Sequence, residues 1–558
     1  MPGLIQIITT TPNETTHQKD LRSNTIQTIG FMMDAIKNSE ESIDQFKEDG
    51  KKIVEIFSKI LTSPDVKEED PQVTAITNAL TQVAAVLKED FAPFMPSIME
   101  KLLTGTQANV DFKLEDAELP TTTDDKMTSV TFKMKGLEGQ KKLSLNTTAL
   151  ETKINSTQVI RALAENLGKT FLPYVEKTYQ VISELFEYKY SKAVRMCAVE
   201  CCQFLVEACE DVTMKEQLMS EMHNKFEVCI QTSLKKKDTD EIVVFLKEYY
   251  HCIKLFTKGA PVSPSQITNL VDLMAQSCHL AFEEKKLTID DLETNRPNLD
   301  EEDIYQYRDG LDEIEKTFLY TMECAGQFMR IYKEDVTQIM KEKLFPLFVQ
   351  NMSKSENTEH EVIDGLCFFI DCCEFLSFEF FQEIHADVIK KFFEIYHSHK
   401  NNEDRDVVQS LSFGLGVIAT RLPSDQYAPY AQEIHSLLEE VINVEDPMSE
   451  QNNYATENAV SSLLKIVFFQ KDGNLITDEH ARKYLEMLPL KEDLDEALAI
   501  NKFLIEQVEK KNQNILATTG AEVEQALNRI AEFHHNDPNL KTLDADLVTR
   551  LTALLSGN

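Results

Sequence analysis

The sequence of 558 residues has no tryptophan and few of the residues that form turns. Glycine occurs 16 times and proline 17 times, whereas average usage is roughly 7% and 5% of a chain. An all-β protein or a dinucleotide-binding α/β protein would need more glycine for its turns. The shortage therefore favours long helices with short connections.

Basic residues are scarce relative to acidic ones. The 57 lysines and arginines stand against 94 aspartates and glutamates, which gives a formal net charge of −37. A field of this sign repels nucleic acid and anionic membranes and attracts basic proteins. We therefore expect a basic protein as the partner, and neither nucleic acid nor a membrane.

Signals for disulfides, membrane spans and leader peptides are missing. None of the eleven cysteines forms a CxxC pair, and the vicinal pairs Cys201–Cys202 and Cys372–Cys373 lie in apolar stretches. We expect reduced, buried thiols, as in the cytosol or nucleus. No run of about 18 apolar residues predicts a membrane span. The first twenty residues lack the features of a signal peptide and look like the second half of a helix.

Catalytic and cofactor motifs are also missing. The sequence has no GxxxxGK[ST], GxGxxG, HExxH or GxSxG motif in a suitable context. His534 and His535 are adjacent, so they would diverge on a helix, and no third ligand stands nearby. We interpret them as part of a surface turn. We predict that the protein is not an enzyme and that it binds no metal and no cofactor.

Helical periodicity is what the sequence does contain, almost from end to end. The segment 51–61 (KKIVEIFSKIL) places its apolar residues on one face. Prolines open the second helix of a pair at Pro96, Pro173 and Pro346, where a fixed φ near −65° suits a first helical turn. This pattern predicts pairs of amphipathic helices joined by short turns.

One region, residues 104–150, loses the helical period, because apolar and polar residues alternate in two short runs. The apolar positions are Val110, Phe112, Leu114, Val130, Phe132 and Met134. Alternation of period two predicts strands, and we expect the two runs to pair as a β-hairpin. The alternative is a disordered insertion, which is tolerated between helices because the cost of loop closure grows slowly with length.

Three helix starts share a pattern. Arg22 and Arg195 each follow an aliphatic residue and precede an apolar face, and Val408 takes the arginine position in the third copy. This is the second-helix pattern of HEAT repeats, whose period is roughly 40–47 residues. In such repeats the arginine lies in a ladder between neighbours, so we interpret Arg22 and Arg195 as ladder residues. At Val408 we expect apolar packing in place of an ion pair.

These features predict an all-α fold, an α–α superhelix of the HEAT or armadillo type. We expect repeats over residues 1–103, the insertion over 104–150, and the same solenoid again over 151–558. Such a solenoid has a concave inner wall, and the charge of −37 predicts that part of this wall is acidic. The function that follows physically is the wrapping of a large basic protein.

The segment 299–315 contains the densest run of acids. These are Asp300, Glu301, Glu302, Asp303, Asp309, Asp312, Glu313 and Glu315. They stand against one base, Arg308. Two interpretations are open: a contact for a basic partner, and a solvated acidic loop or helix face.

Motifs in the last third of the chain resemble a known family. They are FGLGVIA at 413–419, ATEN at 455–458 and LPLKED at 488–493. In this order they resemble the C-terminal part of the importin-β family, of the karyopherin-β3 or importin-5 type. MPGLIQII, EEDPQV and GLEGQKK follow the family order upstream. Met487 stands where the family has tryptophan, and family members are much longer, with an N-terminal arch upstream of the segment that Met1 matches.

The resemblance implies a nuclear transport receptor in the cytoplasm, the nucleus and the nuclear pore. It implies three kinds of partner: basic cargo such as ribosomal proteins or histones, FG-repeat nucleoporins, and Ran-GTP. In the full-length family Ran-GTP mainly contacts the N-terminal arch. The segment 299–315 is then a candidate contact for cargo or Ran.

The resemblance also singles out Glu457 and Asn458 as candidate cargo-binding residues, with Asn458 on a cargo backbone and Glu457 on a lysine. The preferred alternative is structural: Thr456 caps the helix, Glu457 favours its positive end and Asn458 ties the repeat together. Two other functions remain open, a HEAT-repeat scaffold for another complex and a truncated importin without transport activity of its own.

Overall fold

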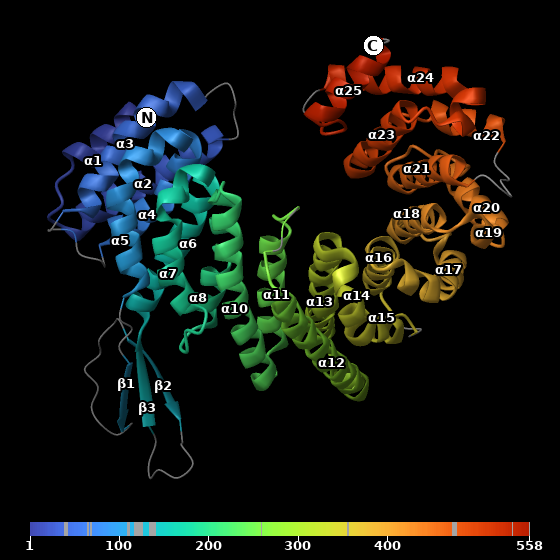
Figure 1. Ribbon diagram of the computed structural model, residues 1–558. Coiled ribbons are helices and arrows are strands. Elements are labelled where there is room, and N and C mark those ends of the chain that lie inside the picture. The colour runs from blue at the N-terminus through green and yellow to red at the C-terminus, as the bar shows by residue number, and fades with distance from the viewer. Residues whose placement is uncertain are drawn as a thin grey trace. The chain divides into compact units, whose positions relative to one another are not determined.

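The computed structural model describes most of the chain. It leaves out residues 38–42, 64–65, 67–69, 109–111, 117–126, 133–140, 258, 260, 354–356, 471–476, 538–539 and 557–558. The described residues are mostly helical and divide into two compact units, residues 1–289 and 290–558 (Figure 1). The predicted all-α class is confirmed.

The first unit begins with α1 and contains most of α12, which crosses the boundary between the units. Its helices are α1 (Pro2–Thr10), α2 (Thr16–Lys37), α3 (Ile43–Leu61), α4 (Pro71–Leu87), η1 (Lys88–Phe94), α5 (Met95–Thr106), α6 (Thr147–Leu167), η2 (Gly168–Tyr174), α7 (Val175–Leu185), α8 (Lys192–Val199), α9 (Cys202–Ala208), α10 (Val212–Lys236), α11 (Thr239–Ile253) and α12 (Pro264–Asn295).

The second unit contains the end of α12 and the helices that follow it. These are η3 (Arg296–Asn298), α13 (Glu301–Tyr332), η4 (Lys333–Val336), α14 (Thr337–Ile339), η5 (Met340–Leu344), α15 (Phe345–Met352), α16 (Glu359–Phe375), α17 (Phe378–His399), α18 (Asp406–Arg421), α19 (Ser424–Tyr427), α20 (Ala431–Ile442), α21 (Asn453–Phe469), α22 (Asp478–Glu486), α23 (Leu494–Glu509), α24 (Gln513–Asn536) and α25 (Ala545–Leu555).

Local signals in the sequence correspond to real helix features. Pro96 and Pro346 stand in the first turns of α5 and α15, and Pro173 lies in η2 just before α7. His534 and His535 lie in the last turn of α24, so their interpretation as a surface turn is wrong. Ten of the eleven cysteines are buried, and all are free. None of the described helices combines the length and apolar character that a membrane crossing requires.

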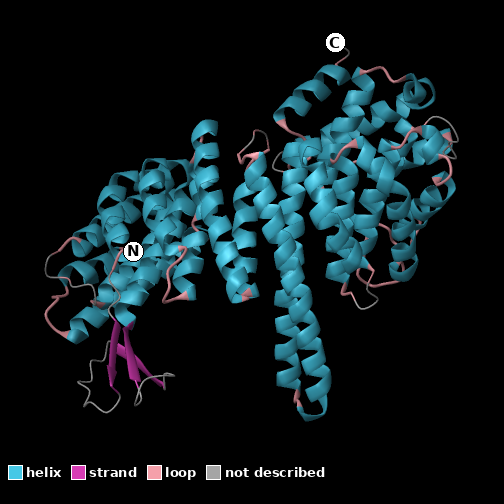
Figure 2. Ribbon diagram, turned by 60° about the horizontal axis from the view of Figure 1, so that its bottom comes forward, coloured by secondary structure: helices cyan, strands magenta, loops and turns pink. Residues whose placement is uncertain are grey.

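The insertion between α5 and α6 contains a three-stranded antiparallel sheet (Figure 2). Its strands are β1 (Phe112–Asp116), β2 (Met127–Phe132) and β3 (Lys141–Asn146). The expected pairing of β1 with β2 is wrong, because both strands pair with β3: Leu114 and Val130 each lie opposite Leu143. In β3 only two leucines alternate with polar residues. The period-two pattern is therefore too short to predict this strand. Val110 and Met134 lie outside the described residues.

Successive repeats of the second unit are joined through the last carbonyl groups of a helix. Arg421 on α18 donates hydrogen bonds to the carbonyls of Cys373 and Leu376 at the end of α16. Gln470 does the same for two carbonyls at the end of α18, and Arg529 on α24 for two at the end of α22. A helix leaves these last carbonyls without intrahelical donors. At these three joints, a side chain of one helix therefore satisfies the backbone at the end of an earlier helix.

The two glycines of α18 allow close approach by neighbours on different sides. A methyl group at Gly414 would lie 2.7 Å from Ile370 Cγ1 and 2.7 Å from Phe392 Cε2, and one at Gly416 would lie 2.7 Å from Ser462 Cβ. Ser462 belongs to α21, whereas Ile370 and Phe392 belong to α16 and α17. Glycine costs a helix about 1 kcal/mol relative to alanine, and the close packing offsets this cost.

Replacement of Gly414 by leucine tests this contact. Gly414→Leu should lower the free energy of unfolding by about 1–3 kcal/mol or more, because the new side chain overlaps Ile370 and Phe392. The matched control is Gly310→Ala on α13, where a methyl group meets nothing within 4 Å. That change should stabilise the helix by about 1 kcal/mol. Unchanged urea midpoints for Gly414→Leu would show that the close approach is unimportant.

Candidate functional site

The inner helices of the second unit border a groove with a volume of about 1230 Å³. These helices are α13, α16, α18, α21 and α23, while α17, α20 and α22 lie on the opposite side of the stack (Figure 1). The acidic residues in its wall are Glu323, Asp371, Glu374, Asp493, Asp495 and Glu496. The basic residues are Arg330, Arg421 and Lys465. Four phenylalanines, at 375, 413, 469 and 503, supply apolar surface.

All three basic groups of the groove have partners within the chain. Lys465 Nζ lies 2.5 Å from Glu496 Oε1. The guanidinium of Arg421 is bound to the carbonyls at the end of α16. That of Arg330 lies 3.7 Å from Asp371 and over the ring of Phe375. These bases are therefore occupied before any partner arrives.

Three of the acids, in contrast, have no hydrogen bond or ion pair to any residue that the structure describes. They are Glu323, which is half-buried, and Glu374 and Asp495, which are exposed. Burial raises the pKa of Glu374, and Arg330, Lys465 and Arg421 oppose this shift without contacting it directly. None of the three acids has a direct partner among the described residues, so the groove attracts a positively charged partner. The sequence did not single out these acids, because they come from separate helices and no local motif contains them.

Asp371 is the most deeply buried carboxyl group in the groove wall. It is 7% exposed and lies directly against Gly326 of α13. Burial raises the pKa of Asp371 to about 7, and the nearby Arg330 opposes this shift. Burial also raises the pKa of Asp364, two turns earlier on α16, to about 7, and neighbouring acids add to the shift. Two carboxyl groups of one inner helix therefore titrate near neutral pH.

Glu457, the first of the predicted cargo-binding residues, holds a segment of the chain itself. It is 1% exposed. Its carboxylate accepts hydrogen bonds from the backbone N–H groups of Lys491, Glu492 and Asp493, at 2.7, 3.1 and 2.8 Å. These residues lead into α23. The geometry favours the structural alternative, because the carboxylate is satisfied and turned away from solvent.

Asn458 also supports this segment, but it reaches the groove wall. Its Nδ2 donates to Asp493 Oδ2 at 2.8 Å, and Gln409 Nε2 donates to the same oxygen at 3.3 Å. Helix α21 begins at Asn453, so the interpretation of Thr456 as its cap is wrong. The amide of Asn458 therefore positions the start of α23 at the edge of the groove.

The acidic segment 299–315 lies outside the groove wall. Asp300 caps α13 and forms a reciprocal capping box with Asp303. The other six acids lie on the first turns of the helix and are exposed or half-buried. The segment is thus a helix face and not a loop, and it is a second candidate contact for a basic partner.

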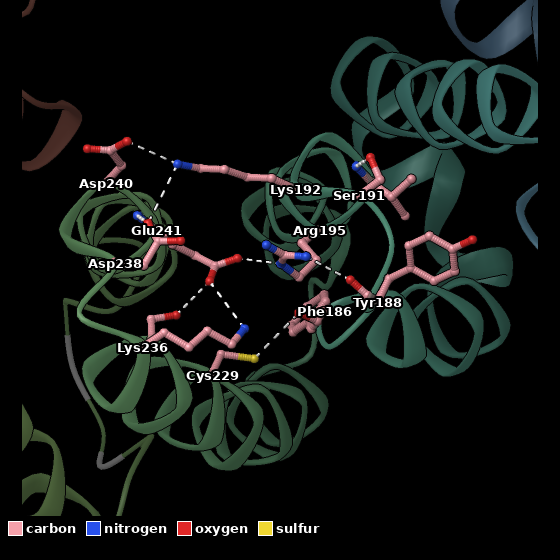
Figure 3. A network of polar contacts seen from close by, with 12 residues as sticks. Phe186, Tyr188, Ser191, Lys192, Arg195, Cys229, Lys236, Asp238, Asp240 and Glu241 are labelled. Atoms are coloured by element: carbon pink, nitrogen blue, oxygen red, sulfur yellow. Dashed lines mark hydrogen bonds and ion pairs between the residues drawn. The ribbon is translucent and has the colours of Figure 1, made fainter. Parts of the chain in front are cut away.

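Arg22 and Arg195 connect helices of neighbouring repeats in the first unit. Arg22 donates to Gln72 Oε1 on α4 at 2.6 Å and to the carbonyl of Ile8 on α1 at 2.5 Å. Arg195 on α8 pairs with Glu241 on α11 and donates to the carbonyl of Tyr188 at 2.8 Å (Figure 3).

Val408, which replaces the ladder arginine, is fully buried. We expected apolar packing at this position. The contact between α18, which carries Val408, and α21 is not purely apolar, because the Ser462 hydroxyl on α21 donates to the carbonyl of Ser412 on α18 at 2.8 Å.

Comparisons with known proteins agree with this architecture. No protein-family model matches the chain. The chain is 25% identical over 547 residues to the probable importin-5 homolog of Dictyostelium discoideum, covering 92% of this chain and 46% of the relative. It is 20% identical over 478 residues to importin subunit beta-3 of Saccharomyces cerevisiae, covering 85% and 42%. The chain spans about half the length of the curated relatives it matches.

Solved structures of Kap121p share the fold. The crystal structure of Kap121p bound to Ste12p matches with a TM-score of 0.66 at 16% identity, over 99% of this chain and 49% of that chain. The crystal structure of Kap121p bound to Nup53p matches with a TM-score of 0.64 at 16% identity, over 100% and 51%. The predicted helical-repeat solenoid is thereby confirmed.

The repeat fold and the relatives together support assignment of the chain to the importin-β, or karyopherin-β, family. Within this family, the relatives point to the importin-5 type. Importins are transport receptors and not enzymes, in agreement with the prediction that the chain is not catalytic.

Glu457 provides a test of the segment before α23. Glu457→Ala should lower the free energy of unfolding by roughly 2–4 kcal/mol, because it leaves three N–H groups without an acceptor. The control Glu492→Ala, at an exposed neighbouring position, should change it by less than about 0.5 kcal/mol. Urea denaturation measures both, and equal small effects would contradict the structural role.

Asp371 makes stability depend on pH. Its folded pKa of about 7 lies above the ordinary value of 3.8, so the folded chain binds more protons than the unfolded chain between these values. Stability should therefore fall as pH rises from about 4 to 7. Asp371→Asn should remove up to about 4 kcal/mol of this decline, as measured by urea denaturation across the range. The exposed Asp387→Asn should leave the decline intact, and an identical pH profile for Asp371→Asn would refute the assignment.

Proposed function

We propose that the chain is the cargo-binding part of an importin-5-type nuclear transport receptor. Its groove binds a basic segment of a cargo protein. The observation that carries this proposal is the charge imbalance of the groove: every base is paired, and Glu323, Glu374 and Asp495 are not. Ribosomal proteins and histones are cargo of suitable charge.

The aromatic residues of the groove complement its charge. The rings of Phe469 and Phe503 stack with centroids 5.5 Å apart, and Phe469 is 47% exposed. Lysine and arginine have long apolar stems and charged ends, so they pack on such rings while they reach a carboxylate. A groove with rings beside free acids therefore suits the side chains of a basic segment.

The relatives support two further parts of the proposal. Because Kap121p has been crystallised with Nup53p, we assign FG-repeat nucleoporins as partners of this chain, which would work between cytoplasm and nucleus at the nuclear pore. The apolar groove between α15 and α17, bordered by Phe345, Val349, Met352, Ile384 and Val388, has the character to take a phenylalanine. We assign Ran-GTP control to the full-length receptor.

Peptide binding by charge-removing variants decides whether a basic peptide binds at the groove or at the acidic segment 299–315. A fluorescent lysine-rich peptide should bind at low salt and weaken steeply as salt rises, because salt screens exposed charges. The triple variant Glu323→Gln, Glu374→Gln, Asp495→Asn should lower the affinity about 10- to 100-fold, since each lost charged contact is worth roughly 0.5–1 kcal/mol. Anisotropy titrations at several salt concentrations measure both effects.

The matched control is the triple variant Glu301→Gln, Glu302→Gln, Asp309→Asn, which removes the same charge from the start of α13. It should bind the peptide nearly as well as the native chain. A loss confined to this control would move the site to the segment 299–315. Equal binding by all three proteins would refute the groove proposal.

The scaffold alternative differs in its partners. A transport receptor binds both the basic peptide and immobilised FG repeats, whereas a scaffold co-purifies stably with one complex and binds neither. A truncated importin would bind the peptide but fail to accumulate cargo in permeabilised nuclei.

A further inference from the structure

Two histidines and a glutamate come together on the outer helices of the second unit, away from the groove. Helix α20 carries His435 and Glu439, and α22 carries His480. One nitrogen or oxygen atom from each of the three lies within 4.8 Å of the others. The two imidazole rings have centroids 5.3 Å apart and are inclined by 71°. All three residues are half-buried.

Helix geometry and repeat stacking create this cluster. Residues four apart lie on one face of a helix, so His435 and Glu439 point the same way from α20. His480 belongs to the next outer helix, 45 positions further along. No local sequence motif contains the cluster, because its third member is one repeat away.

We propose that His435, Glu439 and His480 bind a zinc ion that links α20 to α22. Two imidazole nitrogens and a carboxylate oxygen form a donor set that zinc accepts, with bonds of roughly 2.0–2.2 Å and a water in the fourth position. Atoms within 4.8 Å of one another reach this geometry by small rotations of the side chains. The ion would join two successive repeats on the side opposite the groove.

Hydrogen bonds already engage all three proposed ligands, and His435 Nε2 lies 3.1 Å from the Tyr484 hydroxyl, so this contact must give way or His435 must bind through Nδ1. His480 Nδ1 accepts a hydrogen bond from the backbone N–H of Thr477 at 3.2 Å and lies 3.1 Å from Thr477 Oγ1. A metal at Nε2 therefore requires the ring proton to move to Nδ1, which would then donate to Thr477 Oγ1. Glu439 accepts hydrogen bonds from the Tyr484 hydroxyl and from Asn443 Nδ2, the latter at 2.7 Å. Outer contacts of this kind fix the direction of metal ligands.

A cation already occupies part of the site. Lys483 Nζ lies 2.9 Å from Glu439 Oε2. The side chain of Lys483 is 41% exposed, so its ammonium group can turn into solvent when zinc takes over the carboxylate. Zinc and Lys483 would then compete for Glu439, and removal of the lysine should favour the metal.

Metal titration of the full chain tests the proposal. After treatment with a chelator, the chain is titrated with Co²⁺, whose absorption spectrum separates nitrogen and oxygen ligands from thiolates, and then with Zn²⁺. We expect one equivalent of Co²⁺ without a thiolate charge-transfer band, displaced by Zn²⁺. His480→Ala and Glu439→Gln should each weaken binding by about 100-fold or more, since even outer contacts contribute 10- to 100-fold.

Two further variants make the test specific. Lys483→Met should tighten binding, whereas the pair His534→Ala, His535→Ala on α24 should not alter it. Circular dichroism and peptide binding by the groove confirm that each variant is folded. Absence of Co²⁺ binding, a thiolate band that persists in His480→Ala, or unchanged affinity in Lys483→Met would overturn the proposal and leave a hydrogen-bonded repeat joint.

Discussion

Hydrogen bonds from a side chain of one helix to the last carbonyls of an earlier helix are the contacts on which the rest of the structure depends. A helix end that packs against a neighbour loses water as a donor, and buried carbonyls without partners are costly. Arg421, Gln470 and Arg529 supply these donors at three joints of the second unit. Arg22 supplies one for α1 in the first. Because a stack of repeats is held only by contacts between neighbours, these joints decide the stability of the whole array.

The same joints shape the charge of the groove. Bases are scarce in this chain, and those that line the groove are bound to carbonyls or carboxylates of the stack. The acids that remain free therefore outnumber available bases on the inner helices. A requirement of the backbone thus contributes to the attraction for basic partners.

The region around α21 brings several of these constraints together. Gly416 admits Ser462, Glu457 holds the segment before α23, and Asn458 places Asp493 at the groove edge. The proposed zinc ligands lie on α20 and α22, the outer helices on either side of α21 in the sequence. A substitution that shifts α21 should alter both the groove and the outer surface of the second unit, because the same helices supply the buried contacts and the groove wall.

The sequence by itself determined the helical class, the helix starts at Pro96 and Pro346, and the buried, reduced cysteines. These features depend on local periodicity, on backbone preferences and on composition, all of which act within one helix or one turn. The tertiary structure decided the pairing of β1 and β2 with β3, the structural role of Glu457, and the convergence of Glu323, Glu374 and Asp495 on one groove. Each of these depends on how helices or strands pack against one another. Packing brings together residues that are far apart in the sequence, so no local sequence pattern predicts their contact.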